Sequence, residues 1–188
     1  MWAIATGRAR SVVGAVMVAV MFAAWLGLVS PARAAGFPAP YAPMIVHPVG
    51  APARYEFDLT PALDRARREN KRIYVYLGAS DCPYCRRYDA FLDKNAAALT
   101  QEFAARYIVV DLRSALSATA DRLFVRIRDR SLAYADFQRS IGDERARMLV
   151  YPSVWLLDSN AKPLMQMPAG TGTFQTVDEQ IEILRLEQ

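Results

Sequence analysis

Residues 73–92, IYVYLGASDCPYCRRYDAFL, predict a strand, a short loop and a helix in that order. The run Ile73–Leu77 is β-branched and aromatic, as is typical of a buried strand, and Gly78–Ser80 ends it in a loop. Apolar side chains then recur at helical spacing in residues 86–92, which indicates a helix with an inner face. The run Cys82-Pro83-Tyr84-Cys85 therefore stands at the predicted start of this helix.

The position of the two cysteines favours thiol chemistry. A thiol exchanges disulfides only as its thiolate, and an unperturbed cysteine titrates near about pH 8.5. A helix start stabilises the thiolate through its unpaired N–H groups and its macrodipole. Pro83 suits the first helical position, and the three-residue step brings Cys85 beneath Cys82. We predict that Cys82 is the exposed attacking thiol and Cys85 the more buried resolving thiol, with Arg86 favouring the thiolate and Asp81 opposing it.

The same two cysteines permit two other interpretations. A bridge between Cys82 and Cys85 could be inert, but it would close almost no loop and add little stability. A tetrahedral metal site would need about four ligands, and the chain offers two cysteines and the remote His47. A close pair of cysteines in an exported chain favours redox chemistry instead. We therefore predict no metal and no cofactor, and we expect His47 to lie at the surface or in a turn.

Residues 1–34 have the features of a signal peptide. Two arginines give a positive start, the uncharged stretch Ser11–Ser30 follows, and Ala32-Arg33-Ala34 is a small-x-small cleavage pattern. We expect cleavage near Ala34 and export to the periplasm or another compartment outside the cytoplasm. The alternative is an N-terminal membrane anchor, because the uncharged stretch approaches the roughly 20 residues that span a bilayer.

The charge of the chain beyond this leader argues against a nucleic-acid partner. The leader holds three of the 23 basic residues and no acidic residue, which leaves 20 basic against 19 acidic side chains. Nucleic-acid binding requires a strong basic footprint, and none remains. The 154 residues that follow the leader are enough for one domain with its own core.

The rest of the chain completes an α/β pattern. Residues 35–54 hold five prolines, and we predict an extended segment that is not packed, followed by a single domain over 55–188. Within residues 113–148, Phe124–Arg128 fits either a short strand or a helix edge, and the parts after it have helical patterns over 132–140 and 143–148. Other helices are predicted at about 60–70, 95–106 and 177–186, and other strands at 107–112, 153–158 and 163–167.

The segment Lys71–Leu92 resembles the active-site segment of the thioredoxin superfamily, in particular that of exported thioredoxin-like proteins. The run Tyr151-Pro152-Ser153-Val154-Trp155-Leu156-Leu157-Asp158 is similar in position and style to the family's strand that opens with a cis-proline. The resemblance spans about residues 55–188. It implies an α/β thioredoxin-like fold with a mixed central sheet flanked by helices. Residues 113–148 have no counterpart in plain thioredoxin, and we predict that they form a helical insertion before the cis-proline strand.

The resemblance also implies a function. It suggests a thiol–disulfide oxidoreductase that exchanges disulfides with cysteine-containing exported proteins and is served by a membrane redox partner. The catalytic residues would be Cys82 and Cys85. A cis Pro152 would face them, and the Tyr151 backbone would pair with a substrate strand. The implied substrate-binding residues are Tyr84, Tyr151 and Pro152, and those that tune the thiol pKa are Pro83, Asp81 and Arg86. The alternatives are a thioredoxin-fold binding or scaffold module with a static Cys82–Cys85 disulfide, or a reductase dedicated to one client such as apocytochrome c.

Several residues depart from the family pattern. Asp81 stands where thioredoxin proper has a tryptophan, and Pro83-Tyr84 is the dipeptide of glutaredoxins. The family's buried carboxylate, which helps to deprotonate the resolving thiol, maps onto Tyr76. A phenol titrates near about pH 10 and cannot act as that base at neutral pH. Either water or another group takes the proton, or turnover as a reductase is slow.

Overall fold

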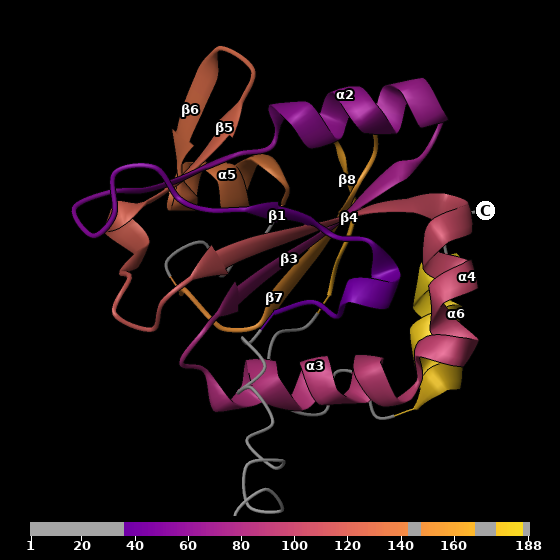
Figure 1. Cartoon of the computed structure of the whole chain (residues 1–188). Helices are drawn as coiled ribbons and strands as arrows, with labels where there is room; N and C mark the ends of the chain where they lie inside the picture. The colour runs from indigo at the N-terminus through magenta and orange to yellow at the C-terminus, as the bar shows by residue number, and fades with distance from the viewer. Residues whose placement is uncertain (1–35, 143–147, 168–175, 186–188) are drawn as a thin grey trace, which may run out of the picture. The chain divides into compact units, whose positions relative to one another are not determined.

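The computed structural model describes residues 36–142, 148–167 and 176–185, which belong to one unit of the chain (Figure 1). The predicted signal peptide and most of the helix predicted at 143–148 lie outside the described residues. None of the helices in the described ranges is both long and apolar enough to cross a membrane.

A five-stranded mixed sheet forms the centre of the fold, in the order β1-β4-β3-β7-β8. Strands β1, β4 and β3 run parallel to one another, whereas β7 is antiparallel to β3 and β8 is antiparallel to β7. The strands are β1 Met44–Val46, β3 Arg72–Ala79, β4 Tyr107–Ser114, β7 Ser153–Leu157 and β8 Pro163–Met167. This arrangement confirms the predicted thioredoxin-like fold class and the strands predicted after residue 72.

Helices cover both faces of this sheet, which is why Ile73–Ala79 of β3 is buried along its whole length. Figure 1 shows α2 and α3 on opposite sides of the sheet. Tyr74 of β3 meets Tyr88 of α3 with their hydroxyls 2.6 Å apart, and Trp155 of β7 packs on the ring of Phe137 in α5, 5.1 Å between centroids. The helices are α2 Thr60–Glu69, α3 Pro83–Lys94, α4 Ala96–Arg106, α5 Tyr134–Ser140 and α6 Val177–Arg185.

The proline-rich segment is packed, contrary to our prediction. Phe37 and Tyr41 are buried, and the Tyr41 hydroxyl donates a hydrogen bond of 2.8 Å to the carbonyl of Leu92. A short 3-10 helix, Ala39–Tyr41, leads into β1, which pairs with β4 at the edge of the sheet. The proline pattern predicts an extended chain, but it does not predict that the rings of Phe37 and Tyr41 pack between the sheet and α4.

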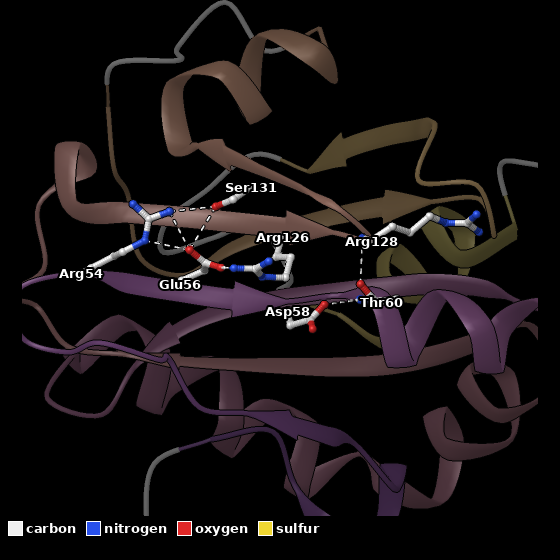
Figure 2. A network of polar contacts seen from close by, with 7 residues as sticks. All are labelled: Arg54, Glu56, Asp58, Thr60, Arg126, Arg128 and Ser131. Carbon is white, nitrogen blue, oxygen red and sulfur yellow. Dashed lines mark hydrogen bonds and ion pairs between the residues drawn. The ribbon is translucent and has the colours of Figure 1, made fainter.

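The insertion is mainly a β-hairpin with one short helix, which corrects the predicted helical insertion. Its strands β5 Leu123–Ile127 and β6 Arg130–Ala133 join β2 Tyr55–Asp58 in a separate three-stranded sheet, and α5 follows. Leu123 and Val125 are buried, and this spacing of two is that of a strand. Figure 2 shows the polar contacts that join β2 to β5 and β6, centred on Glu56.

Candidate functional site

Cys82 lies at the N-terminus of α3, as predicted. It is the N-cap residue, and its Sγ accepts a hydrogen bond of 3.1 Å from the backbone N–H of Cys85. Pro83 is the first residue of the helix, where the missing N–H costs nothing. The hydrogen bond from the Cys85 N–H would stabilise a negative charge on Sγ of Cys82, as unpaired N–H groups at a helix start do. Tyr84, between the cysteines, is 49% exposed.

The strand that begins at Ser153 brings a second loop to the cysteines. The Tyr151–Pro152 peptide bond is cis, which confirms the prediction made for Pro152. The Sγ of Cys82 lies 3.8 Å from the carbonyl oxygen of Tyr151, and the Tyr151 hydroxyl lies 2.9 Å from Oγ of Ser114. The loops after β3 and β4 and the loop before β7 therefore meet at one end of the sheet.

Cys82 is buried, whereas we predicted an exposed thiol. Both Cys82 and Cys85 are free thiols, and each is only 1% exposed. The reason lies in the contacts of Cys82, since its Sγ is turned towards the N–H of Cys85 and the backbone of Tyr151. A protein substrate would reach this sulfur only after a shift of the surrounding loops.

The charged residues predicted to tune the thiols have different surroundings. Asp81 accepts a hydrogen bond of 2.8 Å at Oδ1 from the N–H of Leu116, which ties the loop after β4 to the cysteine loop. Arg86 is exposed on the outer side of α3. The guanidinium of Arg87 lies 5.7 Å from the centre of the Tyr84 ring. Asp81 therefore holds the loop after β4 beside the cysteine loop, in addition to placing a negative charge near the thiols.

Cys85 faces the interior and is a weak acid. The pKa of the Cys85 thiol is raised to about 12, first by burial and then by the nearby Cys82, although contacts with the Ala79 N–H and with Tyr76 act in the opposite direction. The Ala79 N–H lies 3.5 Å from Sγ of Cys85. A thiol with this pKa needs a proton acceptor nearby if it is to react at neutral pH.

Two acidic residues that the sequence analysis missed lie behind Cys85. They line a cavity of about 10 Å³, which has room for about one water molecule. Asp89 accepts hydrogen bonds from the Tyr76 hydroxyl at 3.1 Å and from the Gly36 N–H at 2.9 Å. Burial raises the pKa of Asp89 to about 6. A carboxylate four residues after Cys85, on the same helical face, was the available signal.

Asp111 is the second acidic residue of this cavity. It is 1% exposed, and its Oδ2 accepts hydrogen bonds from the Phe37 N–H at 3.0 Å and from Nε of Arg113 at 2.9 Å. Its Oδ1 is buried without a hydrogen-bond partner. Burial raises the pKa of Asp111, although the charge of Arg113 lowers it. Its signal in the sequence was an acidic residue inside the apolar run Tyr107–Leu112, directly opposite Tyr76 in the register of β3 and β4.

The remaining candidates lie away from this site or have other roles. His47 is exposed next to β1, as expected. Tyr88 and Trp155 are buried core residues. Among the described residues, no group of three or more His, Cys, Asp or Glu side chains is arranged to hold a metal ion.

The family comparison agrees with this architecture. A model of the thioredoxin-like domain family matches residues 59–183. Two solved structures are similar to the chain: a thioredoxin from Thermus thermophilus (17% identity, TM-score 0.43, covering 71% of this chain and 86% of that one), and a thioredoxin-fold protein from Helicobacter pylori (16% identity, TM-score 0.39, covering 61% and 66%). No curated protein matches the chain.

Proposed function

We propose that this chain, which belongs to the thioredoxin-like domain family, is a thiol–disulfide oxidoreductase that acts on cysteine-containing exported proteins. The observation that carries the proposal is the position of Cys82. Its Sγ caps α3, receives the Cys85 N–H at 3.1 Å and lies 3.8 Å from the carbonyl of Tyr151, beside the cis Pro152. A nucleophilic sulfur, a donor that stabilises its charge and a backbone edge for the substrate occur together.

The proposed reaction proceeds through a mixed disulfide. The Cys82 thiolate attacks one sulfur of a client disulfide, and the other client sulfur leaves as a thiolate that takes a proton from solvent. Cys85 then loses its proton and attacks Sγ of Cys82, which forms the Cys82–Cys85 disulfide and releases the second client thiol. The two electrons that reduce the client come from the two protein thiols. The reverse sequence oxidises a client dithiol.

Exposed apolar side chains around the cysteine loops support a polypeptide substrate. Tyr84 is 49% exposed, Leu116 47% and Met148 61%. These residues belong to the cysteine motif, the loop after β4 and the segment before the cis-proline, which meet at one end of the sheet. Export and periplasmic location are part of the proposal and rest on the sequence of residues 1–34. A membrane redox partner that resets the cysteine pair is also part of it and rests on the resemblance to exported thioredoxin-like proteins.

The test is disulfide reduction with insulin as the substrate. We expect Cys82→Ser to abolish reduction, and Cys85→Ser to accumulate mixed disulfides with client proteins in the native host. Trapped proteins that carry signal peptides would support the proposed clients, and one dominant partner would indicate a dedicated reductase. If both variants reduced insulin as well as the unmodified protein, the proposal would be wrong.

The burial of both thiols favours a second candidate, a thioredoxin-fold binding module whose cysteine pair is inert. The rate of thiol alkylation in the folded protein separates the two functions. An oxidoreductase requires Cys82 to be alkylated well before Cys85 and without global unfolding. An inert pair requires both thiols to react only at the rate of unfolding.

A further inference from the structure

The cavity behind Cys85 holds more ionisable groups than a structural core requires. Cys85, Asp89 and Asp111 all line it, together with Tyr76 and Arg113. Two carboxyls in one buried space disfavour the loss of both protons, because like charges repel strongly where water is excluded. The unpartnered Oδ1 of Asp111 is a further buried acceptor beside this space. Such an arrangement is costly to fold and is suited to the movement of a proton.

Tyr76 connects Cys85 to this pair. The Tyr76 hydroxyl donates to Oδ1 of Asp89 at 3.1 Å, and Tyr76 lines the same cavity as Cys85, close enough to lower the pKa of that thiol. Gly78 makes this position possible, since a Cβ at residue 78 would stand 2.6 Å from a ring carbon of Tyr76 and 3.1 Å from its hydroxyl. The hydroxyl is both donor and acceptor, so it can receive a proton from the thiol side and pass its own to the carboxylate.

The N-terminal segment completes the cavity. The Gly36 N–H donates to Oδ2 of Asp89 at 2.9 Å, and the Phe37 N–H donates to Oδ2 of Asp111 at 3.0 Å. The Phe37 ring lies edge-on to Tyr76, 5.5 Å between centroids, and is buried. The segment that we predicted to be unpacked therefore donates a hydrogen bond to each carboxyl and packs against Tyr76, whose hydroxyl is bonded to Asp89.

We propose that Asp89, which accepts a hydrogen bond from the Gly36 N–H and shares its cavity with Asp111, exchanges a proton with Cys85 through the Tyr76 hydroxyl. The inference deepens the proposed function and rests on it. When the mixed disulfide is resolved, the Cys85 proton moves to the Tyr76 oxygen as the Tyr76 proton moves to Asp89. The Cys85 thiolate then forms the bond to Cys82, and Asp89 later returns its proton to solvent. In the oxidising direction the proton travels back along the same path.

The groups that face Asp89 come from each neighbouring element. They are Cys85 on its own helix, Tyr76 on β3, Asp111 and Arg113 on β4, and the Gly36 N–H. Burial raises the pKa of Asp89 to about 6, and the charge of Asp111 adds to this effect while Arg113 opposes it. Asp89 is therefore mostly ionised at neutral pH and still basic enough to accept a proton, the condition for effective general-base catalysis.

A single-turnover reaction with limiting dithiobis(nitrobenzoate) tests the inference. The first coloured thiolate reports attack by Cys82, and the second reports resolution by Cys85. We expect Asp89→Asn to slow the second phase about 10²-fold at pH 7, within the usual range for a lost general base, and to leave the first phase within about twofold. The matched control is Asp93→Asn, which alters an exposed aspartate one turn further along α3 and should leave both phases unchanged.

The pH profile of the second phase separates proton transfer from a structural role. The unmodified protein should show an inflection near pH 6 and a plateau above it, whereas Asp89→Asn should lose the inflection and rise with pH throughout. Asp111→Asn should move the inflection to lower pH, because one neighbouring negative charge is removed. A profile of Asp89→Asn identical to that of the unmodified protein would overturn the inference and leave the proposed function intact.

Tyr76→Phe provides a second variant in case Asp89→Asn fails to fold. It removes the hydroxyl and keeps the ring, and we expect the second phase to slow about tenfold. Full speed in a folded Tyr76→Phe protein would overturn the route through the hydroxyl. If the unmodified protein never released the second thiolate, the proposed function would fail, and this inference would fail with it.

Discussion

Glu56 in the three-stranded sheet and Asp89 behind the cysteines are both acidic side chains turned towards the protein, and their neighbours differ. Glu56 is 8% exposed, and its carboxylate accepts hydrogen bonds from Arg54, Arg126 and Ser131 (Figure 2). Although burial raises the pKa of Glu56, these hydrogen bonds bring it below its ordinary value. The negative charge of Glu56 is thus matched by two guanidinium groups.

Asp89 has the opposite surroundings. Its hydrogen-bond donors are the Tyr76 hydroxyl and the Gly36 N–H, both uncharged, and Asp111 adds a second acidic group to the same cavity. The guanidinium of Arg113 bonds Asp111 instead. Burial consequently raises the pKa of Asp89 to about 6.

The carboxylate of Glu56 is therefore a fixed charge that links strands, whereas the carboxyl of Asp89 can gain or lose a proton near neutral pH. The Glu56 cluster links β2 to β5 and β6, and its lowered pKa means that Glu56 stays ionised to lower pH than an ordinary glutamate. The Asp89 cluster lowers stability at neutral pH, and buried groups of this kind gather where a protein carries out proton chemistry. The two regions therefore make opposite predictions for the removal of a carboxylate.

The largest expected effect is the loss of stability in Glu56→Ala. It removes the acceptor for two arginines and Ser131, and we expect the free energy of unfolding to fall by about 2 kcal/mol. The arginine side chains are 41% and 42% exposed and can be rehydrated, which keeps the loss below that of a fully buried pair. Chemical denaturation measures this change. The exposed Glu182→Ala is the control, and a loss as small as that of the control would contradict the structural role.

The sequence was sufficient for the cysteine region because local patterns determine it. The apolar run Ile73–Leu77 and the helix spacing after Cys85 each predict their own element, and the structure has both. The position of Cys82 at a helix start follows from the same patterns. The cis form of Pro152 was implied by the resemblance to the thioredoxin superfamily, and the structure has it too.

What the sequence could not predict depends on contacts between distant segments. Phe37 and Asp111 are 74 residues apart, and nothing local shows that a proline-rich segment supplies an N–H to a carboxylate in β4. The sequence left Phe124–Arg128 open between a strand and a helix edge, and the structure makes Leu123–Ile127 a strand through its pairing with the distant Tyr55–Asp58. The burial of Cys82 likewise arises from the Tyr151 loop rather than from its own neighbours.

The second-largest effect that we expect, after the loss in Glu56→Ala, is a gain in stability in Asp89→Asn. The raised pKa means that the folded protein binds the Asp89 proton more tightly than the unfolded chain does, so this group reduces stability above about pH 6. We expect Asp89→Asn to raise the free energy of unfolding at pH 7 by about 1–2 kcal/mol. The gain should shrink as the pH falls from about 6 to 4 and vanish below the ordinary pKa of an aspartate, where Asp89 is neutral in both states.

Denaturation curves at pH 7 and pH 4 for the unmodified protein, Asp89→Asn and Asp93→Asn measure this difference. Asp93→Asn should change stability little at either pH, because Asp93 is exposed. A loss of stability at pH 7 in Asp89→Asn, similar in sign to that of Glu56→Ala, would remove the contrast between the two carboxylates.

The smallest expected effect tests how the structure holds Tyr76 against the cavity. The backbone at Gly78 is one that alanine can adopt, and alanine is favoured over glycine in a strand by about 0.5–1 kcal/mol. The new Cβ would stand 2.6 Å from a carbon of the Tyr76 ring, which must move. We expect a net loss of about 1 kcal/mol in Gly78→Ala, because overpacking costs about 1–3 kcal/mol. In the double variant with Tyr76→Leu, the shorter side chain should abolish the clash, so the two losses should not add. Additive losses would show that Gly78 does not position Tyr76. Of the two uncharged donors to Asp89, only the Gly36 N–H would then have a structural explanation for its position.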